Sequence, residues 1–163
     1  VGLHHSCAIL VSKQVKCWGR NNHGQLGIGE TGDRGGSRAG MGTSLPTVQL
    51  GKTRQVVQLA VGDNHNCARL ADGDFKCWGR NDDSELGTST PSVGTGQMGE
   101  AIVPTNPSDW HVRDIVATGQ QTCVIGPDWN LNCWGKDTPA GTVTRPTPVP
   151  VGPVVHAALG RSH

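Results

Sequence analysis

Hydrophobic and polar positions alternate along short stretches of this chain, and the arrangement recurs. Apolar runs with a two-residue period lie at 56–61, 115–117 and 154–159, which is the pattern of partly buried β-strands. A glycine follows each run closely, and it opens a further stretch of alternating residues. No segment has the 3.6-residue period over the length of a useful helix. The pattern therefore predicts an all-β chain built from short strands.

The recurring unit is most complete from Gly62 to Gly87, which reads GDNHNCARLADGDFKCWGRNDDSELG. The same frame starts at Gly2, returns in a shorter form at Gly119, and begins again at Gly160. Internal repeats of this length are typical of propellers and arrays, and no linker divides the chain into two domains. We expect one repeat region that is an excerpt of a larger propeller, with units at about 2–61, 62–118 and 119–159 and the start of a fourth at 160–163.

Each unit opens with a predicted hairpin. In the second unit the turn is expected at Ala71-Asp72-Gly73, because its last position needs a left-handed residue, which glycine adopts easily. The first unit has Lys13 at that position, and the third has Pro127-Asp128-Trp129, for which a different turn is expected. A Thr/Pro-rich stretch at 138–153 is expected to be extended and exposed.

The hairpin places two cysteines opposite each other. In the second unit, the turn pairs Arg69 with Phe75, Ala68 with Lys76, and Cys67 with Cys77, within bonding reach. All six cysteines follow this spacing of ten, as Cys7 and Cys17, Cys67 and Cys77, and Cys123 and Cys133. The spacing favours three disulfides and an oxidising compartment. Zinc bound with His4, His5 or His65 is the alternative, but paired zinc ligands usually have two residues between them, not nine.

Composition excludes several classes of protein. The 163 residues include 24 Gly and 10 Pro but no Tyr, so turns should be dense and helices few. With 14 basic and 13 acidic residues, the net charge of +1 gives no attraction to nucleic acid or to an anionic membrane. No apolar run approaches the roughly 18 residues of a membrane span.

Other residues could carry chemistry, but each has a simpler role. Two Gly-rich segments, 27–32 and 94–99, match the dinucleotide-binding pattern without the strand–helix context that it requires. His5 and His65 lack an evident catalytic partner, so structural hydrogen bonds are expected for them. The tryptophan after each cysteine pair should pack against the disulfide or a neighbouring blade. Calcium ligands are conceivable at Glu30, Asp33, Asp82, Asp83 and Glu85, and O-linked sugars at 88–92 and 138–147.

One family shares these motifs. Gly-x-x-His-x-Cys-Ala-x-Leu, followed by a turn and Cys-Trp-Gly-x-Asn-x-x-Gly-Gln-Leu-Gly, resembles the regulator-of-chromosome-condensation repeat. The match covers nearly the whole chain, although the third unit has Gln120-Gln121-Thr122 instead of the histidine-bearing segment. The residues that carry it are His5, Ala8, Leu10, Trp18, Gly19, Asn21, Gly24, Gln25, Leu26 and Gly27, and then His65, Ala68, Leu70, Trp78, Gly79, Asn81, Leu86 and Gly87.

The resemblance implies a β-propeller, usually with seven blades of four antiparallel strands. The cysteine pairs look like the subtype found in secreted or surface proteins. The family includes a nuclear exchange factor for a small GTPase and a secreted inhibitor of β-lactamases, and both use propeller loops. No local motif transfers the interaction residues of either protein to this chain.

These observations lead to one expected function and three alternatives. We expect a non-catalytic extracellular or cell-surface module without a cofactor or metal. It would bind a protein, or assemble into a structure that could be filamentous, through propeller loops or blade edges. The alternatives are an exchange-factor-like regulator of a small GTPase, an accessory domain of a secreted enzyme, and a secreted enzyme inhibitor.

Overall fold

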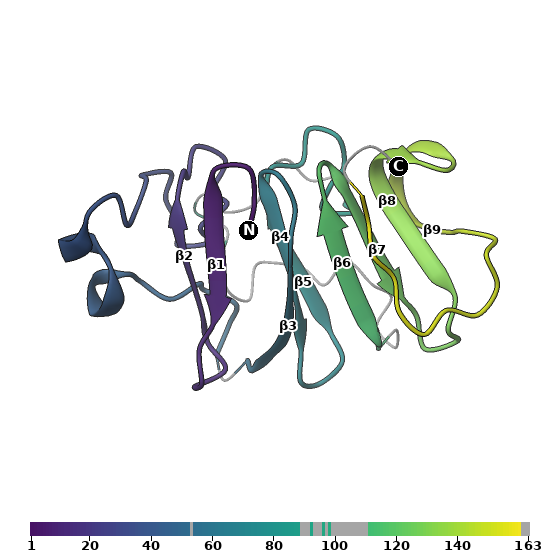
Figure 1. Ribbon diagram of the computed structural model, residues 1–163, viewed down its shortest axis with the longest axis horizontal. Helices are drawn as coiled ribbons and strands as arrows, with labels where there is room; N and C mark the ends of the chain where they lie inside the picture. The colour runs from purple at the N-terminus through teal and green to yellow at the C-terminus, as the bar shows by residue number, and fades with distance from the viewer. Residues whose placement is uncertain (53, 89–91, 93–95, 97, 99–110, 161–163) are drawn as a thin grey trace.

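The computed structural model of the chain describes residues 1–52, 54–88, 92, 96, 98 and 111–160. The strands of these residues form three antiparallel sheets that stand side by side in chain order (Figure 1). Two short 3-10 turns, η1 (Arg38–Gly40) and η2 (Gly42–Ser44), lie in the connection between the first two sheets. The strands are β1 (His5–Ile9), β2 (Val15–Gly19), β3 (Val56–Val61), β4 (His65–Leu70), β5 (Phe75–Gly79), β6 (Asp114–Thr118), β7 (Gln121–Ile125), β8 (Leu131–Thr138) and β9 (Gly141–Pro148).

We call the sheets blades 1, 2 and 3. Blade 3 has four strands in the order β6-β7-β8-β9, whereas the described residues give blade 2 the order β3-β4-β5 and blade 1 the pair β1-β2. Two isolated bridges, Lys16 to Thr47 and Gly19 to Arg34, continue blade 1 beyond β2. The fold is therefore all-β and forms part of a β-propeller, as predicted from the sequence.

The sheets are offset from the sequence repeats. The apolar strand that closes the first repeat, β3, pairs with β4 of the next repeat, and β6 pairs with β7 in the same way. Blades 2 and 3 therefore each draw their first strand from one repeat and their following strands from the next one.

All three hairpins use the same turn. Lys13, Gly73 and Trp129 occupy its left-handed position, with φ of 65°, 92° and 65°. The N–H of each donates to a carbonyl three residues earlier, at 2.9, 3.0 and 3.1 Å. The prediction of a different turn in the third repeat is therefore wrong. Identical pairing on both sides of the turn imposes the left-handed conformation even on lysine and tryptophan.

The two predicted extended segments near the C-terminus differ. Within 138–153, residues 141–148 form β9, a mostly exposed edge strand that pairs with β8. The apolar segment 154–159 is not a strand in the structure, which corrects the prediction. β3 and β6 gain their hydrogen bonds from the strand that follows them, and no described residues follow residue 160. Alternation alone cannot form a strand without a paired backbone.

The core lies between the blades as well as within them. Trp78 and Trp134 are completely buried, and the Phe75 ring of blade 2 stacks on Trp134 of blade 3 at 5.8 Å between centroids. Within blade 2, Gly79 has a φ of 109°, and an added Cβ there would lie 2.5 Å from the carbonyl oxygen of Asn64, so glycine permits the close pairing of β4 and β5. The blades are consequently joined by large aromatic side chains that each reach back to the previous blade.

Candidate functional site

The structure contains a disulfide in each of the three hairpins. They join Cys7 to Cys17, Cys67 to Cys77, and Cys123 to Cys133, with 4.1 Å between the Cα atoms of each pair. The predicted register places each pair directly opposite in its ladder. The blade 2 and blade 3 cysteines are at most 3% exposed. Because all six sulfurs are bonded in this way, none is free to bind zinc as a thiolate.

A polar loop follows each of the first two Cys-Trp-Gly segments and is held by one asparagine. In blade 1, Asn21 Nδ2 donates to the carbonyls of Glu30 and Gly32 at 2.6 and 3.1 Å, while Asn21 Oδ1 accepts from the N–H of Leu26 at 2.8 Å. In blade 2, Asn81 bonds to Leu86 and Thr88 in the same way. Both amides are buried, so they fix the loop from inside and leave its outer residues exposed.

The blade 1 loop also accepts hydrogen bonds from two side chains of blade 2. The carbonyl oxygen of Gln25 accepts the Trp78 indole N–H at 3.0 Å and the Asn66 side-chain N–H at 2.7 Å. Asn66 Oδ1 in turn accepts from Nε2 of His5, at 2.9 Å. A buried chain of hydrogen bonds therefore runs from a histidine of blade 1, through blade 2, and back to the loop of blade 1.

The same chain of bonds recurs between blades 2 and 3. The carbonyl oxygen of Glu85 accepts the Trp134 indole N–H at 2.8 Å and the Thr122 hydroxyl at 2.9 Å. Because the Thr122 hydroxyl donates to Glu85, its oxygen accepts from Nε2–H of His65 at 2.8 Å. We call these two arrangements the inter-blade relays. They confirm the structural hydrogen bonds predicted for His5 and His65 and the predicted inter-blade contacts of Trp78 and Trp134.

Burial keeps both histidines neutral. His65 is 1% exposed, and loss of solvent lowers its pKa to about 3. The pKa of His5 is lowered for the same reason, with a smaller opposing effect from its hydrogen bond to Asn66. Gly2 and Gly62 lie directly against these rings, and a Cβ at Gly62 would come within 2.1 Å of Cε1 of His65. This contact explains the spacing Gly-x-x-His in the repeat.

Acidic side chains of the blade 2 loop surround Arg80. The Arg80 guanidinium bonds to Asp82 at 2.8 Å and Asp83 at 3.3 Å, and lies 3.9 Å from the carboxylate of Glu85. Glu85 is 1% exposed, and its burial raises its pKa. In blade 1, Glu30 pairs with Arg34, and Asp33 accepts the N–H of Asn21. The candidate calcium ligands therefore already bond to groups of the protein itself.

The remaining candidates do not form a reaction centre in the described residues. His5 bonds to Asn66 of the next blade rather than to the adjacent Ser6. The first Gly-rich segment, 27–32, opens no helix, and most of the second lies outside the described residues. Among the described residues, no cluster of three histidine, cysteine or acidic side chains could hold a metal. No helix of the described residues is long and apolar enough to cross a membrane. Of the candidate sites for O-linked sugars, residues 138–147 lie at the end of β8, in the following turn and in β9, and residues 89–91 of the segment 88–92 lie outside the described residues.

Sequence reasoning missed the second half of each relay. Asn66 and Thr122 share one position, directly before the second-strand cysteine, and each lies opposite the tryptophan of its blade. The signal was weak because the two residues differ and the first repeat has Ser6 there. Buried Lys76, whose ammonium donates to the carbonyl of Leu50 at 3.0 Å, was also read only as a ladder residue.

Comparison with known families agrees with this geometry. Residues 1–25 and 56–85 match one model of the Regulator of chromosome condensation (RCC1) repeat, and residues 14–69 match another. Together the matches span residues 1–85, more than half of the chain. The chain belongs to the regulator of chromosome condensation repeat family. Its three hairpin disulfides fit the cysteine-bearing subtype of these RCC1-type repeats.

Curated relatives have varied roles. Ultraviolet-B receptor UVR8 of Arabidopsis thaliana is 28% identical over 138 residues, which cover 82% of this chain and 28% of that protein. Protein RCC1 of Candida albicans is 28% identical over 142 residues, covering 82% and 30%. A probable E3 ubiquitin-protein ligase, HERC4 of Rattus norvegicus, is 31% identical over 86 residues, covering 53% and 8%. The chain thus spans less than a third of the length of each of these relatives.

Solved structures share the fold. Human WBSCR16 superposes with a TM-score of 0.71 at 21% identity, covering 92% of this chain and 36% of that one. The complex of Kap60 bound to yeast RCC1 (Prp20) gives 0.68 at 18% identity, covering 93% and 36%. The CRINKLY WD40 ectodomain of the Arabidopsis thaliana receptor kinase ACR4 gives 0.50 at 21% identity, covering 85% and 37%.

Proposed function

We propose that this chain is a non-catalytic protein-binding module of a secreted or cell-surface protein. The observation that carries the proposal is the disulfide in each hairpin. Disulfides persist in oxidising compartments and are rare where thiols are kept reduced. An ectodomain among the structures with the same fold supports an extracellular setting for such blades.

The loop geometry supports binding. Asn21 and Asn81 hold two loops in the same conformation, but the side chains at their outer positions differ in charge. Blade 1 presents Asn22 and His23, whereas blade 2 presents Asp82 and Asp83. A constant frame with variable outer residues is how a rigid scaffold creates a specific surface. The complex of yeast RCC1 with Kap60 is one example of a propeller of this fold with a protein partner.

The relays support a role without catalysis. His5 and His65, the buried side chains best suited to acid–base chemistry, already bond to the neighbouring blade. Arg80 is engaged by carboxylates of its own loop. These groups stabilise the scaffold, which leaves recognition to the exposed loop residues.

Thiol mapping of the native protein tests the compartment. Protein taken from its source is alkylated before unfolding and digested without reduction. We expect the three peptide pairs linked through Cys7–Cys17, Cys67–Cys77 and Cys123–Cys133. Alkylated cysteines at all six positions would refute the extracellular role.

Charge reversal at Asp82 and Asp83 tests binding through the loops. The same change at Asp72, in the hairpin turn at the opposite end of β5, is the control.

Regulation of a small GTPase is the second candidate, because Protein RCC1 of Candida albicans matches over most of this chain. The resemblance implies exchange activity through loops on one propeller face. Release of a fluorescent guanine nucleotide from purified small GTPases distinguishes the two functions. Accelerated release would favour the regulator, and unchanged rates in the presence of disulfide-bonded protein would favour the binding module.

A further inference from the structure

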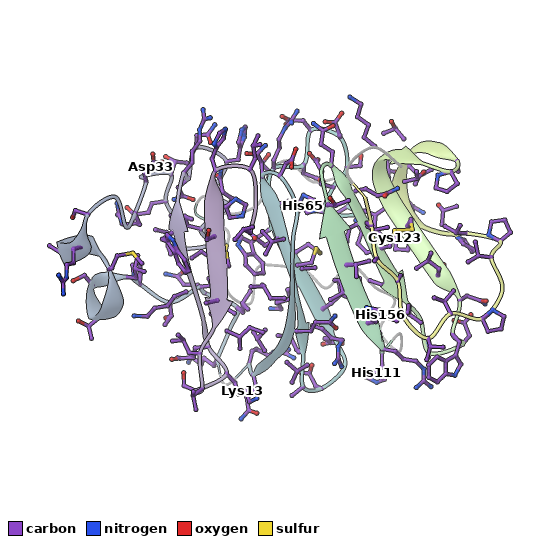
Figure 2. The ribbon with its side chains drawn as sticks, viewed as in Figure 1. Lys13, Asp33, His65, His111, Cys123 and His156 are labelled. Carbon is purple, nitrogen blue, oxygen red and sulfur yellow. A yellow bond between two sulfur atoms is a disulfide. The ribbon has the colours of Figure 1, made fainter. Side chains whose placement is uncertain are left out.

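A pocket lies between blades 1 and 2, at the end of the blades that carries the hairpin turns. Figure 2 marks this end with Lys13 and His111, and the opposite end, which carries the polar loops, with Asp33. The pocket has a volume of about 510 Å³, which is typical of sites for small molecules. Its walls come from the turn of blade 1 and from the segment that leads into β3, so both sides of the pocket belong to the described chain.

Uncharged polar side chains form the rim of this pocket. Ser12 and Gln14 lie in the hairpin turn of blade 1, and Gln55 lies directly before β3. All three residues are exposed. Hydroxyl and amide groups both donate and accept hydrogen bonds. The rim therefore suits a ligand whose own polar groups do both.

The inner wall of the pocket is aliphatic. It consists of Val15, Val48, Leu50 and Val56, each at most 8% exposed. These side chains offer contacts to C–H groups but no hydrogen bonds. A polar rim beside an aliphatic wall suits a ligand with polar edges and one apolar face.

The charges around the pocket are nearly balanced. Arg54, which also lines it, forms ion pairs with Asp72 and Asp74 of the blade 2 turn. Lys13 and Lys52 adjoin the lining residues in the sequence. Three basic and two acidic side chains together give little attraction to either an anion or a cation. A neutral ligand is therefore favoured.

Main-chain hydrogen bonds hold the walls in place without a ligand. The N–H of Ala71 donates to the carbonyl of Gln55 at 2.9 Å, and the N–H of Val56 donates to the carbonyl of Lys13 at 2.9 Å. The segment before β3 is thus fixed to the turns of both blades. Because the pocket is already formed, binding costs little ordering of the chain.

The same corner between blades 2 and 3 contains larger side chains. Phe75 holds the register position of Val15 at the start of its strand. His111 holds the position of Gln55, because the N–H of the next residue bonds to the turn in both blades. The His111 ring lies directly against Gly73, where an added Cβ would be 2.4 Å from Nδ1. Val15 and Gln55, the smaller counterparts, leave space between blades 1 and 2.

We propose that this pocket binds a neutral saccharide, as one sugar ring of a glycan. The hydroxyl groups of a sugar ring donate and accept hydrogen bonds as the rim requires, and its C–H face packs on the aliphatic wall. The pocket lies at the opposite end of the blades from the polar loops. The proposal therefore goes beyond protein binding through the loops and does not depend on it.

Titration of the 163-residue, disulfide-bonded chain, followed by NMR, tests the proposal. The probes are glucose, galactose, mannose and N-acetylglucosamine, raised through the millimolar range in which a single sugar ring is expected to bind. At least one sugar should shift the amide signals of Ser12, Gln14 and Gln55 saturably. No saturable shift of these signals with any of the four sugars would overturn the proposal. Shifts with acetate or N-methylacetamide alone would also overturn it, since they would indicate an anion or a peptide main chain.

Two glutamine substitutions test the position of the site. Gln55→Ala should weaken the binding of that sugar about three- to tenfold, because a hydrogen bond of the rim is lost. Gln49→Ala is the matched control. Gln49 is also exposed, but its amide oxygen lies 3.7 Å from the place of a Cβ on Gly29, in the polar loop of blade 1. Equal affinities of the two variants would overturn the position of the site.

Val15→Phe gives the pocket the side chain that blade 2 has at this register. The larger ring should fill the space and weaken sugar binding at least roughly tenfold. A folded variant that binds as tightly as the parent would contradict the proposal, and the glutamine pair decides the matter if this variant does not fold. Charge reversal at Asp82 and Asp83 should leave sugar binding unchanged, so failure of the loop surface and failure of the pocket are distinguishable.

Discussion

His65 should make the stability of this fold depend on pH. The structure gives the folded protein a neutral imidazole with a pKa of about 3, whereas the unfolded chain has an ordinary value of 6.5. The unfolded state therefore binds a proton more readily, and stability is fully present above pH 6.5. It is lost as the pH falls from 6.5 toward 3, because unfolding is then favoured by protonation.

The size of this effect follows from the two pKa values. Each pH unit below 6.5 removes about 1.4 kcal/mol from the free energy of unfolding until the folded state is also protonated. The loss from His65 alone is thus about 2 kcal/mol between pH 7 and pH 5. His5 adds a loss of the same sign, since burial lowers its pKa too. Glu85 opposes both, because its raised pKa favours the folded state as the pH falls.

The repeat supplies matched substitutions for the measurement. Gln121 holds the position of His65 in blade 3, opposite Gly135, and Gln25 holds the position of Glu85 in blade 1. His65→Gln keeps a donor for Thr122 but cannot titrate, and Glu85→Gln removes the opposing carboxyl group. Urea unfolding at pH 7, 6 and 5 should show a flatter pH dependence for His65→Gln and a steeper one for Glu85→Gln. A His65→Gln variant that keeps the full slope of the parent would refute the role of His65.

Four further predictions concern single features of the blades. Lys13→Gly should raise the free energy of unfolding by roughly 0.5–1 kcal/mol, because glycine adopts the left-handed turn without strain; a lower melting temperature would contradict this. Gly73→Ala should destabilise instead, since its Cβ would lie 2.4 Å from Nδ1 of His111, and unchanged melting would count against the contact. Asn81→Ala should lower the free energy of unfolding by about 1–3 kcal/mol, because it leaves the buried N–H of Leu86 without its acceptor; Asn22→Ala, on the exposed part of the equivalent loop, is the control. Replacing Cys67 and Cys77 together by alanine should cost about 2–3 kcal/mol in the chain-entropy model, and equal urea midpoints for variant and parent would exclude that contribution.

The hairpins could be predicted because their determinants are local. Gly73, the ten-residue cysteine spacing and the alternating side chains define the turn, the pairing of Arg69 with Phe75 and the position of the disulfide within a few residues of each other. The error at Trp129 arose from weighing residue preference above the pairing that encloses the turn. A left-handed backbone disfavours tryptophan, but two paired strands determine the conformation.

The inter-blade relays could not be predicted in the same way. His5 and Asn66 lie 61 residues apart, and His65 and Thr122 lie 57 apart. The sequence marks the histidines by repetition, but their acceptors are an amide in one blade and a hydroxyl in the next. Only the placement of adjacent blades shows what these two side chains share. Each accepts from a histidine and donates to a main-chain carbonyl, that of Gln25 or that of Glu85.

The offset between repeats and sheets has a consequence for how such chains can grow. Because the last strand of one unit opens the following sheet, duplicating a unit inserts two half-sheets rather than one independent module. A newly added copy is then tied to its neighbours on both sides by peptide bonds as well as by side chains. Units gained or lost in evolution would change the number of blades, while the backbone would still cross every boundary between adjacent blades.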